Sequence, residues 1–82
     1  MEIAGYRVSK HLEEYLKEER AYIKQEWIER TINNPDFIME VSSEEIRLWK
    51  QIPEFGDRFL RVVVNPKVKV IITAFFDRRF KR

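Results

Sequence analysis

The segment Asn33-Asn34-Pro35 divides this chain of 82 residues into two parts with different hydrophobic patterns. Before the break, apolar residues recur at helical spacing, and after it they alternate as they do in strands. Because proline disfavours helical backbone at the residue before it, the helical part ends here. The length allows one small domain, which we expect to span residues 1–82.

The spacing before the break predicts helix over about residues 9–33. Ser9 precedes the first apolar turn and is expected to cap it. A second apolar stripe starts at Ile23, and a turn near Arg20–Tyr22 would separate the two stripes. Since neither Gly nor Pro marks that turn, the pattern fits two helices or one kinked helix.

After the break, four β-rich segments are joined by short turns, which predicts an antiparallel sheet. The helical part would cover one face of this sheet. The predicted fold class is therefore α+β, with two N-terminal helices packed on one face of a four-stranded antiparallel sheet. The expected strands lie at about residues 37–41, 45–52, 58–64 and 68–77, and a basic tail follows at 78–82.

Charge is distributed unevenly along the chain. Residues 1–41 hold six Lys/Arg and nine Asp/Glu (6 − 9 = −3), whereas residues 42–82 hold ten and five (10 − 5 = +5). One positive surface would attract nucleic acid or an acidic partner protein. The plainer alternative is a charge-rich surface that only keeps the protein soluble.

Residue counts exclude several classes of site. The chain has no cysteine and one histidine, so neither a disulfide framework nor a catalytic thiol is available, and we expect no metal and no cofactor. No apolar run approaches the roughly 20 residues of a membrane span, and the N-terminus lacks the pattern of a signal peptide. The expected location is the cytoplasm, without membrane contact.

Period-two alternation assigns side chains to the two faces of the sheet. Toward the helices it places Leu60, Val62, Val64, Val70, Ile72, Ala74 and Phe76. On the uncovered face it places Arg47, Trp49, Phe59, Arg61, Thr73, Phe75 and Asp77. A bulge or a one-residue slip would exchange these sets.

Arginines mixed with aromatic rings and a hydroxyl are typical of an RNA-binding surface, because guanidinium groups pair with phosphates and rings stack on bases. Arginine can also stabilise a phosphodiester that is cleaved without metal, with His11 as general acid or base. Two alternatives remain open. Arg47 and Arg61 can pair across strands with carboxylates such as Glu45 or Asp77, and the aromatic residues can form a dimer or partner interface.

Four motifs occur in an order that resembles a bacterial and archaeal family of unknown function within the barnase–EndoU–colicin–RelE fold group. They are His11, Glu26–Ile32 with Asn34-Pro35, Leu60–Val63 and Thr73–Arg79. The resemblance covers nearly the whole chain and implies RelE/ParE-like architecture. It also implies a toxin of a type II toxin–antitoxin system, with metal-independent endoribonuclease activity. The implied partners are RNA, including RNA on the ribosome, and a cognate antitoxin protein.

The resemblance implies catalytic roles for His11, Arg61 and Thr73, and it places the family's Asp-Arg on Asp77 and Arg78. RNA or phosphate contacts are expected from Arg47, Trp49, Lys50, Arg78 and Arg79. Two other functions stay open. One is a non-catalytic module that binds nucleic acid or protein, and the other is a gyrase-inhibiting, ParE-like toxin.

Overall fold

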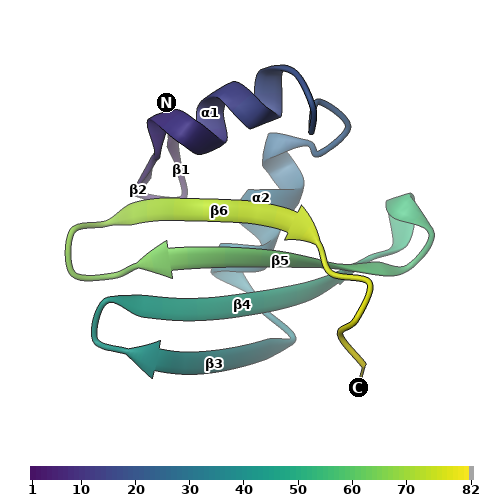
Figure 1. The fold of residues 1–82 in the computed structure, drawn as a ribbon. Coiled ribbons are helices and arrows are strands. Elements are labelled where there is room, and N and C mark those ends of the chain that lie inside the picture. Colours follow the sequence, from purple (N-terminus) through teal and green to yellow (C-terminus); the bar gives the residue numbers. More distant parts are fainter. Residues whose placement is uncertain (82) are drawn as a thin grey trace.

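The computed structural model of the protein describes residues 1–81 and has an α+β fold in two layers (Figure 1). The sheet has six strands in the order β1-β2-β6-β5-β4-β3, and all neighbouring strands are antiparallel except the parallel pair β2 and β6. The elements are β1 (Glu2–Ile3), β2 (Tyr6–Val8), α1 (Lys10–Lys17), α2 (Gln25–Asn33), β3 (Phe37–Ser42), β4 (Glu45–Ile52), a 3₁₀ turn at Pro53–Phe55, β5 (Arg58–Asn65) and β6 (Val70–Phe76).

The expected four-stranded antiparallel sheet is wrong, and so is the RelE/ParE-like arrangement with helices at the N-terminus. The helices follow β1 and β2, which form a hairpin around Ala4 and Gly5, both at positive φ. β2 then pairs with β6 in parallel, with Val8 opposite Ile71, so the sheet is mixed. Strands of two and three residues are too short to show an alternating pattern.

The helical part of the chain forms two helices rather than one kinked helix. Ser9 caps α1 as expected, because its Oγ accepts a hydrogen bond from the Leu12 amide at 3.1 Å. Between the helices the chain turns through hydrogen bonds from the Arg20 amide to Tyr15 and from the Ile23 amide to Arg20. Neither helix is long or apolar enough to cross a membrane, in the part of the chain that the structure describes.

One apolar core joins the helices to the sheet. α2 lies against β4 and β5, and α1 lies along β6 (Figure 1). Ile28 and Trp27 of α2 are buried with Leu60 and Val62 of β5, and Leu12 of α1 belongs to the same cluster. The face of the sheet opposite α2 is free of helices, and we call it the open face.

A β-bulge corrects the predicted face assignment on β6. Val63 pairs with Thr73 and Val64 pairs with Ile71, so Ile72 has no partner on β5. Ile71 is fully buried, whereas Ile72, expected to face the helices, is 40% exposed. The extra residue reverses the alternation, and Thr73 and the residues after it keep their predicted faces.

Candidate functional site

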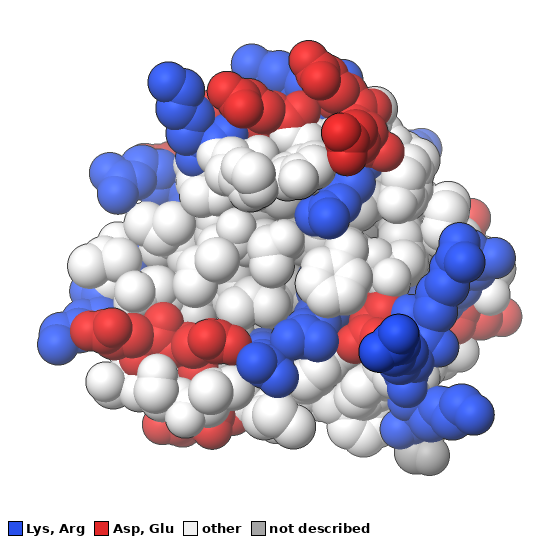
Figure 2. Space-filling view, viewed as in Figure 1, with Lys and Arg blue, Asp and Glu red and all other residues white. Residues whose placement is uncertain are grey.

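The open face brings together side chains from three adjacent strands. Trp49 on β4 pairs with Arg61 on β5, and Arg61 pairs with Phe75 on β6. In the next row, Arg47 and Thr73 flank Val63. Figure 2 shows this face as a broad uncharged band, with Lys and Arg next to Asp and Glu along its lower side. The predicted uncovered set therefore does share one surface.

Arg61 lies between two aromatic rings at the centre of this surface. Its guanidinium carbon is 5.5 Å from the ring centroid of Trp49 and 5.2 Å from that of Phe75. Nη1 forms an ion pair with Asp77 Oδ2 at 3.6 Å, and Nε is buried with no hydrogen-bond partner among residues 1–81. The two rings flank the guanidinium, while most of its N–H groups are not used by Asp77.

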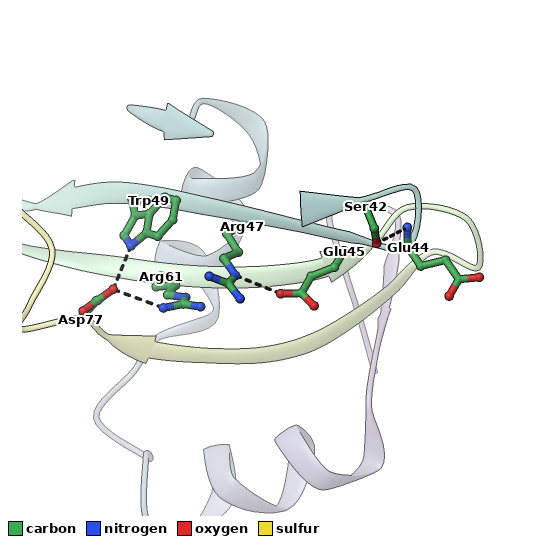
Figure 3. Close-up of polar contacts among 7 residues, drawn as sticks. All are labelled: Ser42, Glu44, Glu45, Arg47, Trp49, Arg61 and Asp77. Carbon is green, nitrogen blue, oxygen red and sulfur yellow. Dashed lines mark hydrogen bonds and ion pairs between the residues drawn. The ribbon is translucent and has the colours of Figure 1, made fainter. Parts of the chain in front are cut away.

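Asp77 links Arg61 to the end of the sheet (Figure 3). Its carboxylate accepts hydrogen bonds from Trp49 Nε1 and from the Arg79 amide, both at 3.1 Å. Burial raises the pKa of this carboxyl group, but the two hydrogen bonds and the charge of Arg61 outweigh burial and bring the pKa below 3.8. Asp77 is therefore a carboxylate at neutral pH.

Arg47 is also paired with a carboxylate. Its Nε donates to Glu45 Oε2 at 2.9 Å, two residues away on the same strand. Figure 3 shows the result, two neighbouring arginines with one carboxylate beyond each of them. The alternative that both arginines pair with carboxylates across strands is confirmed for Arg61 and Asp77, whereas Arg47 pairs with Glu45 on its own strand.

Arg20 is a third arginine at this surface, and sequence reasoning missed it. It lies in the turn between the helices, and its Nη1 donates to Thr73 Oγ1 at 3.3 Å and to the Ala74 carbonyl at 3.1 Å. Its guanidinium also lies over the rings of Tyr15, at 4.5 Å, and Phe75, at 5.8 Å. Among residues 1–81 no carboxylate lies within ion-pair distance of Arg20.

His11 lies at the edge of this group. Its ring meets the ring of Tyr15 edge-on, with centroids 4.6 Å apart, in a hollow that Glu14, Glu18 and Glu19 also line. Tyr15 in turn contacts Arg20. His11 is thus connected to Thr73 through two side chains, and within residues 1–81 it forms no hydrogen bond or ion pair with Arg61 or Thr73.

Trp49, expected to stack on RNA, is only 5% exposed. The ring of Phe80 stacks on its indole, and Phe37 and Phe59 close the sides of this cluster. A base can reach Trp49 only when Phe80 moves away. The cluster is therefore a second apolar group on the open face, separate from the core.

The other expected phosphate contacts lie in two different places. Lys50 alternates with Trp49, so it lies on the face that α2 covers, where it donates to Asp36 Oδ1 at 3.3 Å. Arg78 and Arg79 are exposed beyond the end of β6. Arg78 lines a cleft there. No group of three or more His, Asp or Glu suited to a metal ion occurs within residues 1–81.

The fold and the open face define a small α+β domain with an arginine and aromatic surface on its sheet. A family model described as a domain of unknown function, DUF4258, matches residues 8–76, and the chain belongs to this family. The match includes Arg20, Arg61 and Thr73 and stops just before Asp77. Neither the curated proteins nor the solved structures contain a match to this chain.

Proposed function

We propose that this protein binds single-stranded RNA on the open face of its sheet. The observation that supports the proposal best is that two arginines from different elements contact the same aromatic ring. Arg20 from the helix turn and Arg61 from β5 both lie over the ring of Phe75, and Arg20 also reaches the hydroxyl of Thr73.

Arginine charge supports phosphate as the group that is recognised. Across this surface, Arg20, Arg47 and Arg61 face the two carboxylates Glu45 and Asp77. One positive charge is left over, and both pairs leave guanidinium N–H groups free for phosphate oxygens. The rings of Tyr15 and Phe75 beside these arginines offer stacking surfaces for unpaired bases, which a duplex does not present.

The test is a fluorescence anisotropy titration of a labelled oligoribonucleotide of about 12 nucleotides. We expect binding that weakens as salt rises, because phosphate contacts release counterions. R20A and R61A should each weaken binding about tenfold, the loss expected for one charge-assisted contact. K67A removes one charge from the exposed turn between β5 and β6 and should bind as the wild type does.

Circular dichroism and thermal melts will show that each variant is folded. Binding that is absent in the wild type, or equal in R61A and K67A, would overturn the proposal.

A second candidate function is metal-independent RNA cleavage by a toxin of a type II toxin–antitoxin system. The contacts from His11 to Tyr15, from Tyr15 to Arg20 and from Arg20 to Thr73 favour it, since they connect a histidine to the arginine cluster. In this reaction the ribose 2′-hydroxyl attacks the adjacent phosphorus and the 5′-oxygen leaves. A 2′,3′-cyclic phosphate and a free 5′-hydroxyl result.

In that candidate reaction, His11 would move the proton between the two hydroxyl groups, and Arg20 and Arg61 would stabilise the charge on the phosphorane. A cognate antitoxin would cover the arginines of the open face, and RNA on the ribosome is a candidate substrate.

The candidates separate in one experiment, inducible expression in bacteria with growth and total RNA followed together. Cleavage predicts growth arrest and RNA breakdown that H11A and R61A relieve. It also predicts that purified protein cleaves RNA in the presence of EDTA. Normal growth and intact RNA from well-expressed, folded protein would overturn the toxin and leave RNA binding as the function.

A further inference from the structure

A cleft lies at the end of the sheet where β6 stops and β5 begins. It is lined by Arg58, Phe59, Phe76, Asp77, Arg78 and Phe80. A second hollow, lined by Tyr22, Phe55, Arg58, Phe76 and Arg78, shares three of these residues and so adjoins it. We call the two together the end groove. Phe59 and Asp77 belong to both the end groove and the open face, so the two surfaces are continuous.

Three aromatic rings of the end groove lie nearly parallel in one cluster, and each of them contacts the other two. Phe55 and Phe76 lie with centroids 4.2 Å apart and planes 22° from parallel. Tyr22 stacks on Phe55 at 5.5 Å, with planes 15° apart. Tyr22 is 49% exposed, so part of its ring is open to solvent. An exposed ring at the edge of an aromatic cluster offers a surface for one more planar group.

The end groove contains two arginines, Arg58 and Arg78. Arg58 and Arg78 are both exposed, and among residues 1–81 neither has a carboxylate within ion-pair distance. The guanidinium of Arg58 lies over the ring of Phe55, 5.5 Å from its centroid. Asp77, the acid in the lining, is held by Trp49, Arg61 and the Arg79 amide.

The surrounding surface adds to this charge. Figure 2 shows Lys and Arg gathered on the side of the molecule where the chain ends, next to the uncharged band of the open face. Arg79 and Lys81 are exposed there as well. An anion that approaches the end groove is therefore attracted before it makes contact.

We propose that the end groove holds one nucleotide of a single-stranded nucleic acid, with its base stacked on Tyr22 and its phosphate between Arg58 and Arg78. This rests on the proposed function, because it extends the path of RNA from the open face to the end of β6. The arginines and the aromatic rings together determine which ligand the end groove prefers. Free guanidinium groups recognise any phosphate, but a stack of rings favours one that carries a base.

The test compares three variants in the same anisotropy titration, using a labelled oligouridylate as the probe. R58A/R78A should lower the affinity about a hundredfold, because two arginine contacts are lost, and should reduce the salt slope by about one, because both arginines contact the same phosphate. Y22A should lower it on the order of tenfold through the lost stacking, and Y22F should keep wild-type affinity. All of these residues are exposed or half-buried, and thermal melts check folding.

The controls separate this proposal from RNA binding by the open face. If R20A and R61A weaken binding while R58A/R78A behaves as K67A does, nucleotide binding in the end groove is ruled out and RNA binding on the open face is supported. If only R58A/R78A and Y22A weaken binding, the end groove stands and the open face fails. An oligomer of abasic ribose phosphates that binds as tightly as oligouridylate would overturn the stacked base and leave a general anion site.

Discussion

The ring of Phe80 stacks on the indole of Trp49, with centroids 4.7 Å apart and planes 18° from parallel. Within residues 1–81, the backbone of Phe80 forms one long hydrogen bond, of 3.4 Å, from its amide to the Asp77 carbonyl. Ring contacts with Trp49, Phe37 and Phe59 hold the Phe80 side chain against the sheet. Phe80 therefore covers Trp49, the tryptophan that we expected to contact RNA.

Replacing Phe80 should uncover Trp49. We expect F80A to lower the free energy of unfolding by about 1–2 kcal/mol, since a half-buried ring and its stacking are lost. In a W27F background, where Trp49 is the remaining tryptophan, its emission should shift to longer wavelength. K81A removes the next, exposed side chain and should change neither quantity. Unchanged emission in F80A would show that Phe80 does not cover the indole.

Asp77 should stabilise the fold only while it is ionised. Its folded-state pKa lies below 3.8, so its contribution is complete above that value and is lost as pH falls through the folded pKa. D77N should therefore be less stable than wild type at neutral pH by about 1–3 kcal/mol, the range for hydrogen bonds to a charged group. The gap should narrow as pH falls below 3.8. Denaturant melts across pH measure it, and a gap of constant size would contradict this role for the carboxylate.

Glu54 should titrate at an unusually low pH. Two hydrogen bonds from Arg30, at 2.9 Å and 2.7 Å, together with a backbone hydrogen bond, lower the pKa of Glu54 to about 2. Because the folded pKa is lowered, the pair stabilises the protein above 4.5 and the effect disappears as pH falls toward 2. Carbon NMR of the side-chain carboxyl should report this value, and R30A should return it toward 4.5. An R30A pKa equal to that of wild type would rule out the pair as the cause.

Ile71 and Ile72 provide a matched pair that tests the bulge. I71A removes a fully buried side chain and should cost about 2–5 kcal/mol of stability. I72A changes a side chain that is 40% exposed and should cost less than about 1 kcal/mol. Chemical denaturation of both variants gives the comparison. Equal losses of stability, or a larger loss in I72A, would contradict the bulge and favour a regular alternation along β6.

The sequence patterns predicted the parts of the fold that repeat over many residues. The strand Glu45–Ile52 has its predicted bounds, and the alternation on β4 and β5 correctly put Arg47, Trp49 and Arg61 on one face. The patterns failed where one or a few residues determine the strand pairing or the face of the sheet. The bulge at Ile72 interrupts the two-residue alternation, and the strand Tyr6–Val8 is too short to show it.

The candidate site likewise contains residues whose positions the sequence predicts and one residue that it does not predict. Arg61 and Thr73 follow from alternation, because both lie on regular stretches of strand. Arg20 does not, since its role depends on a turn that carries it to β6, more than 50 residues later in the chain. An arginine at an expected helix break, without an acidic partner at helical spacing, was the available signal.

The most direct measurement is NMR chemical-shift mapping of the labelled wild-type protein as oligouridylate is added. The account predicts shifts concentrated on the open face and the end groove, at Arg20, Arg61, Thr73, Phe75, Arg58 and Tyr22, that fade as salt rises. Shifts confined to the exposed edge strand β3 or to the outer side of α2, or no shifts at all, would contradict it.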